Sequence, residues 1–158
     1  MYIRELTIDE LDQCAPFGMA FHEEVGHPDP FSLASFLEHW EAFYTQGIGV
    51  VFGLFEDDDT LIGGIGGVLA KDITSGTLNL NEMFWYVQKD KRHSTGRWPL
   101  RLITHLKAWG RLRRAKRFHM VHFFTKQDDP DAVRLSHIYT KILKLEPSEL
   151  GFVGAIGV

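Results

Sequence analysis

Three strand-like segments follow one another in the middle of the chain and are joined by short polar turns. They are residues 48–55 (IGVVFGLF), 61–70 (LIGGIGGVLA) and 77–87 (TLNLNEMFWYV). Strands connected by turns this short pair with one another in the antiparallel sense. Glycines inside the second segment permit close backbone approach or a bulge. The sequence therefore predicts an antiparallel meander, against which the remaining segments must pack.

Two helices are expected before this meander. The opening residues MYIREL alternate and predict a short first strand. Thr7 and Glu10 have the spacing of a capping box, which starts the first helix. Asp29 caps the second helix, in which apolar residues recur every three or four positions until Gly47. The dense aromatic side chains of this second helix indicate either core packing or the surface of a homodimer.

The second half of the chain is mainly helical. An apolar stripe predicts a helix from near Pro99 to Arg113, the segment FHMVHFF (118–124) predicts a buried strand, and Asp131 caps a last helix. The tail GFVGAIGV could add a final strand. The resulting order, β-α-α-β-β-β-α-β-α(-β), is that of an α+β protein with a mixed, mostly antiparallel central sheet flanked by helices.

The composition indicates one soluble globular domain spanning residues 1–158. Apolar residues make up 44% of the chain, which is enough for a core without disulfides. A net charge of −4 argues against a nucleic-acid partner. The single Cys14 and the dispersed histidines predict no metal site. Because neither a signal-peptide pattern nor a long apolar run is visible, we expect a cytoplasmic protein with no membrane partner.

The most informative segment joins the third strand of the meander to the next helix. It is polar and basic, and it contains Arg92, His93, Ser94, Thr95, Gly96 and Arg97. A helix N-terminus offers free backbone N–H groups and a partial positive charge, so it binds phosphate readily. The small residues let an anion approach the backbone closely. A solvated basic turn in which Ser94 or Thr95 caps the helix is the alternative interpretation.

This segment and the order of elements together resemble the GNAT acyltransferases. In that family a strand ends in an aliphatic or aromatic pair, here Tyr86 and Val87, and Arg/Gln-x-x-Gly-x-Gly/Ala and an amphipathic helix follow. Arg92 matches the first position of that motif. The helix around Tyr139 is similar to a later helix of the family that carries a tyrosine. The chain departs from the family's pattern in the loop HSTGR, where Gly96 is the single glycine.

The resemblance implies transfer of an acyl group, usually acetyl from acetyl-CoA, to a primary amine by direct attack in a ternary complex. The acceptor would be a small molecule or a peptide. Loop N–H groups would hold the pyrophosphate, and the exposed edge of the preceding strand would pair with the pantetheine amides. The residues expected to contact coenzyme A are Trp85, Tyr86, Val87, Arg92, His93, Ser94, Thr95, Gly96 and Arg97.

Two residues are candidates for proton transfer. The resemblance implies that Tyr139 donates a proton to the departing thiolate, whereas a tyrosine packed on the sheet is the alternative. Glu82 lies among apolar neighbours, where burial raises the pKa of a carboxyl toward the value that a general base needs. Simple alternation places Glu82 on the face of Phe84 and Tyr86, while the family's spacing favours Asn81. A β-bulge would reconcile the two, and a partly exposed strand glutamate remains the alternative.

Two other hypotheses remain open. A catalytically inactive GNAT fold could bind a protein or a nucleic acid, and an unrelated α+β domain could bind another ligand. Binding of coenzyme A separates the enzyme from both. If the chain is an enzyme, Glu23 and Glu24, between the first two helices, are candidates for attracting a cationic acceptor; otherwise they are solvated loop charges.

Overall fold

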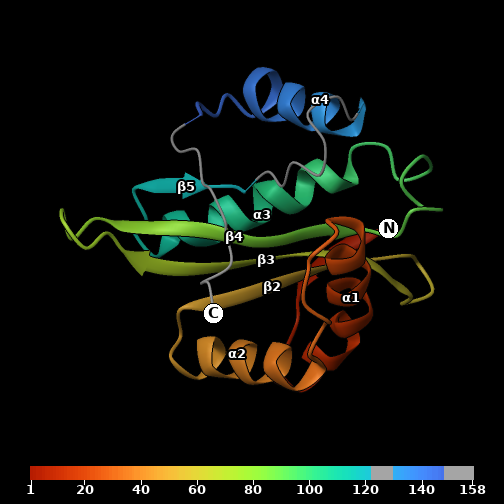
Figure 1. Ribbon diagram of the computed structural model, residues 1–158, viewed down its shortest axis with the longest axis horizontal. Helices are drawn as coiled ribbons and strands as arrows, with labels where there is room; N and C mark the ends of the chain where they lie inside the picture. Colours follow the sequence, from red (N-terminus) through yellow and green to blue (C-terminus); the bar gives the residue numbers. More distant parts are fainter. Residues whose placement is uncertain (122–129, 148–158) are drawn as a thin grey trace, which may run out of the picture. The chain divides into compact units, whose positions relative to one another are not determined.

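A five-stranded sheet forms the centre of the larger of two compact units (Figure 1). The computed structural model describes residues 1–121, which make up this unit, and residues 130–147 of the second unit. The strand order is β1-β2-β3-β4-β5, with β5 parallel to β4 and all other pairs antiparallel. The strands are β1 (Tyr2–Glu5), β2 (Gly49–Phe55), β3 (Leu61–Lys71), β4 (Leu78–Val87) and β5 (Arg117–His119).

Helices cover both faces of this sheet, with α3 on one face and α1 and α2 on the other (Figure 1). The first unit contains the 3-10 helix η1 (Ile8–Cys14), α1 (Ala15–Glu24), α2 (Leu33–Thr45) and α3 (Trp98–Leu112). In the second unit, the described residues form α4 (Pro130–His137) and one turn of π-helix, η2 (Ile138–Ile142). The α+β architecture and the element order expected from the sequence are confirmed through α4.

Several predicted boundaries are wrong in informative ways. Ser32, rather than Asp29, caps α2, because the Ser32 hydroxyl accepts a hydrogen bond from the Ser35 N–H at 3.2 Å. α4 already begins at Pro130, so Asp131 is a helix residue and not the cap. The strand predicted at 118–124 is observed over 117–119. Positions 122–124 and the strand expected in GFVGAIGV lie outside the described residues.

Two adjacent glycines let helices approach the sheet from opposite sides. A Cβ on Gly66 would lie 2.6 Å from Cζ2 of Trp40 in α2, and one on Gly67 would lie 2.6 Å from a methyl group of Leu106 in α3. Successive strand residues face opposite sides of a sheet, so each glycine makes room for a different helix. The expected role of these glycines in close approach is confirmed.

The packing at Gly66 gives a first test. Gly66→Ala should lower the free energy of unfolding by about 1–3 kcal/mol, because the new methyl would overlap the rings of Trp40 and Phe84. Gly64→Ala is the matched control on the same strand, since the nearest atom there, the Phe52 carbonyl oxygen, lies at 3.1 Å. Urea unfolding of both variants measures the difference, and equal losses would contradict the assignment of Gly66 to the helix contact.

Candidate active site

An extra residue in β4, Met83, forms a β-bulge. Glu82 pairs with Gly67 of β3 and Phe84 pairs with Gly66, so Met83 is left without a partner on that strand. Cross-strand partners share a face of the sheet. Glu82 therefore faces α3 and Phe84 faces α2. The prediction from simple alternation, that Glu82 and Phe84 lie on one face, is wrong because the inserted residue moves Phe84 to the opposite face. The β-bulge that would reconcile the two predictions is present.

Glu82 is buried at the point where β4 and β5 separate. It is 6% exposed, and its Oε2 accepts a hydrogen bond from the Val121 N–H at 3.3 Å. Burial raises the pKa of the Glu82 carboxyl to about 7, while the hydrogen bond from Val121 acts in the opposite direction. The alternative of a partly exposed glutamate is therefore wrong. A carboxyl that titrates in this range can accept and release protons near neutral pH.

Within the described residues, β5 covers only part of the neighbouring edge of β4. β5 pairs with β4 only at Asn79, Leu80 and Asn81, and no described strand pairs with this edge from Glu82 to Val87. An open strand edge presents backbone N–H and C=O groups that an extended ligand with amides can pair with. The described residues therefore leave free the strand edge at which pantetheine is expected to pair, and that pairing stays a prediction.

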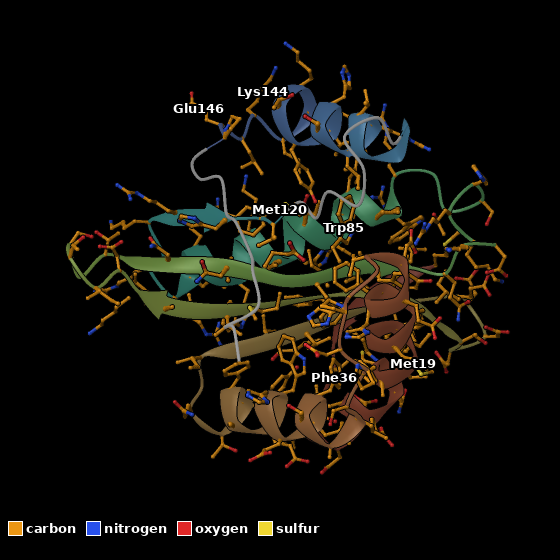
Figure 2. The ribbon with its side chains drawn as sticks, viewed as in Figure 1. Met19, Phe36, Trp85, Met120, Lys144 and Glu146 are labelled. Carbon is orange, nitrogen blue, oxygen red and sulfur yellow. The ribbon has the colours of Figure 1, made fainter. Side chains whose placement is uncertain are left out.

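The α3 side of this opening carries Trp85 and Met120, which Figure 2 shows on the same side of the β4 ribbon. Trp85 pairs with Ile65, so the bulge places its side chain on the α3 face together with Glu82. The Trp85 Nε1–H is buried and has no acceptor among the described residues. Buried donors are nearly always paired in folded proteins, so this N–H group is a candidate donor to a bound ligand.

The loop after β4 is held by its own hydroxyl groups. The Ser94 Oγ donates to the Lys91 carbonyl at 3.0 Å, and the Thr95 Oγ1 donates to the Arg92 carbonyl at 3.2 Å. The N-cap of α3 is Arg97, and no side chain caps this helix. The alternative in which Ser94 or Thr95 caps α3 is therefore wrong, because both hydroxyls close the turn that precedes the helix.

Three backbone N–H groups of this loop, those of His93, Gly96 and Arg97, have no acceptor within the described part of the chain. Gly96 has a φ of +54°, the left-handed conformation that glycine adopts without strain. Apart from its two chain neighbours, no described residue has an atom within 4 Å of the position that its Cβ would take, so this side of the backbone is open to an approaching anion. Together with the positive end of α3, these groups can bind phosphate.

The Arg92 side chain joins the loop to α1 and to the end of β4. Its Nη1 and Nη2 donate to the two carboxylate oxygens of Glu24 at 2.8 and 2.8 Å, and its Nε donates to the Val87 carbonyl at 2.9 Å. This pair holds the pKa of Glu24 below its usual range. Glu24 is thus already neutralised by an arginine, and the suggestion that it attracts a cationic acceptor is not supported.

The remaining predicted residues divide into two groups. The side chains of Tyr86, Val87 and Thr95 are buried in the first unit, so none of these three side chains is exposed to a ligand there. Tyr139 belongs to the second unit, where it is half-buried in η2 and its carbonyl accepts a hydrogen bond from the Leu145 N–H at 2.9 Å. Its role as a proton donor stays a prediction.

Sequence reasoning missed several polar groups near the junction of β4 and β5. The Asn79 Oδ1 and the His119 Nε2 are buried without a hydrogen-bond partner in the described residues. The alternation of Asn79 and Asn81 with apolar neighbours was the available signal. No signal marked Val121, because it acts through a backbone N–H that every residue except proline possesses.

Other chemistries find little support in the described residues. The described residues contain no cluster of three or more His, Cys, Asp or Glu side chains placed to hold a metal ion. Cys14 is fully buried, and burial raises the pKa of its thiol to about 12, so the thiolate nucleophile is scarce at neutral pH. None of the described helices has the length and hydrophobicity that crossing a membrane requires.

No family model and no curated protein matches the sequence, but solved structures match nearly the whole chain. An aminoglycoside acetyltransferase from an uncultured soil metagenomic sample matches at 18% identity with a TM-score of 0.70, over 99% of this chain and 98% of its own. A ribosomal-protein-alanine N-acetyltransferase from Brucella melitensis biovar Abortus 2308 matches at 15% identity with a TM-score of 0.66, over 99% and 100%. The chain has the GNAT fold.

A third structure with the GNAT fold includes a ligand. AAC(6')-Iy, in complex with the bisubstrate analog CoA-S-monomethyl-acetylneamine, matches at 17% identity with a TM-score of 0.70, over 99% of this chain and 98% of its own. At these identities the likeness establishes the GNAT fold, while activity must be argued from the residues of this chain.

The raised pKa of Glu82 predicts that the stability of this GNAT fold depends on pH. Because the folded pKa of about 7 exceeds the unfolded value of 4.5, the stabilising contribution is full below pH 4.5 and is lost as the pH rises through 7. Between pH 5 and pH 8 the wild-type free energy of unfolding should fall by about 2–3 kcal/mol relative to Glu82→Gln. Urea unfolding across this range measures it, and parallel profiles would contradict the assignment.

Proposed function

We propose that this chain, as one domain over residues 1–158, is an acyl-CoA-dependent N-acyltransferase that transfers acetyl from acetyl-CoA to a primary amine. The observation that carries the proposal concerns the described residues. Among them, no strand pairs with the β4 edge from Glu82 to Val87, and the adjacent loop has three N–H groups without acceptors. The names of neighbouring structures support it, since they include acetyltransferases and a complex with a coenzyme A analog.

Acetyl-CoA suits the chemistry of these two features. Its pyrophosphate would bind the N–H groups of His93, Gly96 and Arg97 at the start of α3. Its pantetheine amides would pair with the β4 edge at Trp85, and the unpartnered indole N–H offers a further donor. A pantetheine chain that runs along β4 from the loop toward the bulge at Met83 would bring the thioester close to Glu82.

The transfer needs a neutral amine and a protonated leaving group. The amine nitrogen attacks the thioester carbon, an N–C bond forms, and the C–S bond breaks. Glu82 would take the proton that the amine loses, either directly or through a water molecule. With a pKa of about 7, a large fraction of this carboxyl is ionised at neutral pH. Tyr139 would give its hydroxyl proton to the coenzyme A thiolate in the proposed mechanism.

The proposed acceptor is a primary amine on a small molecule or a peptide. The named substrates of structural neighbours include an aminoglycoside and the alanine of a ribosomal protein, and both classes provide such an amine. A GNAT fold used only for binding would not need a buried carboxyl with a pKa of about 7 at the point where β4 and β5 separate. Glu82 therefore favours the enzyme over the inactive alternative.

Calorimetric titration with acetyl-CoA tests the loop directly. Acetyl-CoA should bind the wild-type protein, and Gly96→Trp should abolish binding because the indole would cover the loop N–H groups. Gly76→Trp is the matched control, since Gly76, in the β3–β4 turn, also has a positive φ and open space at the position of an added Cβ. No heat from folded wild type at millimolar acetyl-CoA would overturn the enzyme proposal, and equal losses in the two variants would overturn the loop assignment.

Steady-state kinetics tests the proton-transfer residues. Glu82→Gln should lower kcat by about 10²–10⁴-fold, and the rise of wild-type kcat/KM with pH near 7 should disappear in this variant. Tyr139→Phe should lower kcat while leaving acetyl-CoA binding intact. Release of coenzyme A thiol, followed with aminoglycosides and an alanine-terminated peptide as acceptors, measures both. An unchanged kcat in either variant would remove that residue from the mechanism.

A further inference from the structure

Glu24 occupies an electrostatically unfavourable position for a carboxylate. It is the last residue of α1, and negative charge is disfavoured at a helix C-terminus. The Arg92 guanidinium supplies a cation there, through a two-pronged pair whose side chains are 36% and 32% exposed. Lys89 is more distant, at 3.9 Å from Glu24, and more exposed. The hydrogen bonds that tie the end of α1 to the loop thus come from Arg92.

The geometry of this pair restricts Arg92 strongly. The guanidinium binds both oxygens of Glu24 and the Val87 carbonyl, and it lies 5.1 Å from the centre of the Tyr86 ring. A planar guanidinium matched to a carboxylate by two parallel hydrogen bonds is fixed in orientation as well as in position. Arg92 cannot move without breaking contacts to α1 and β4 together.

Two hydrogen bonds connect the position of Arg92 to the start of α3. The Arg92 carbonyl accepts the hydrogen bond of the Thr95 hydroxyl, and Thr95 is 1% exposed. The Thr95 carbonyl in turn accepts a hydrogen bond from the N–H of Trp98, the first residue of α3, at 3.0 Å. The N–H groups of His93 and Gly96 lie between these fixed points.

We propose that Glu24 is a positioning residue for the phosphate loop, acting through Arg92 to hold the loop N–H groups in the arrangement that binds acetyl-CoA. The inference rests on the proposed function, because it concerns the same site. A loop that is ordered before binding loses less conformational entropy on binding. Removing the Glu24 carboxylate therefore weakens the affinity for coenzyme A and leaves the chemical step unchanged.

Glu24→Gln and a matched control, Glu10→Gln, separate positioning from general stability. Glu10 forms the same kind of pair with Arg4, at 2.7 and 2.8 Å, and Arg4 lies 4.4 Å from the centre of the Phe55 ring. Glu24→Gln should raise the Kd and KM for acetyl-CoA by about tenfold at constant kcat. Amide hydrogen exchange over residues 92–97 of the ligand-free variant should also be faster. Glu10→Gln should lower the Tm without either effect.

Arg92→Lys is a second variant, which keeps the positive charge but loses the two-pronged geometry and the Nε–H bond to Val87. It should weaken acetyl-CoA binding and speed loop exchange as Glu24→Gln does. An unchanged Kd in Glu24→Gln, with wild type binding normally, would overturn this inference alone. Equal changes in Glu24→Gln and Glu10→Gln would also overturn it. Wild type that fails to bind acetyl-CoA would overturn the proposed function and this inference together.

Discussion

One inserted residue in β4 determines where the protein can place a buried carboxyl group. Before Met83 the side chain of Glu82 faces α3, and after it the side chain of Phe84 enters the aromatic core beside Trp40. An uninterrupted strand would direct Glu82 into that core, where an ionised carboxyl has no polar partner to offset its desolvation. The bulge resolves this conflict, because it lets an aromatic core and a carboxyl occupy the same strand on opposite faces.

The carboxyl also takes part in opening the sheet. In a continuing ladder, the N–H groups that follow β5 would bond to carbonyls of β4. Instead the Val121 N–H donates to the Glu82 side chain, and pairing between the two strands ends at Asn81. One side chain thus satisfies a backbone donor that the sheet no longer uses, and among the described residues the β4 edge is left without a partner strand beyond Asn81. The buried position of Glu82 and the open edge are therefore two consequences of one arrangement.

Local patterns predicted the meander, α3 and the element order, because alternation and helical periodicity depend on neighbouring residues alone. The α2 cap could not be chosen between Asp29 and Ser32, since both side chains can accept the required hydrogen bond and the path of the chain decides. The bulge remained one option among several, because register is a property of two strands. The pair between Glu24 and Arg92 spans 68 positions, a separation at which no sequence pattern marks a contact.

In the proposed site, that pair would compensate for the single glycine of the loop, where the GNAT motif that the sequence resembles has two. Gly96 provides the left-handed residue, while Arg92 and the Thr95 hydroxyl fix the rest of the turn through contacts to α1 and to the loop itself. The proposed constraint on the loop is therefore a tertiary contact as well as a backbone motif. A comparison of sequence motifs detects a backbone motif but not a tertiary contact. This is consistent with a fold that matches solved acetyltransferase structures while no family model matches the sequence.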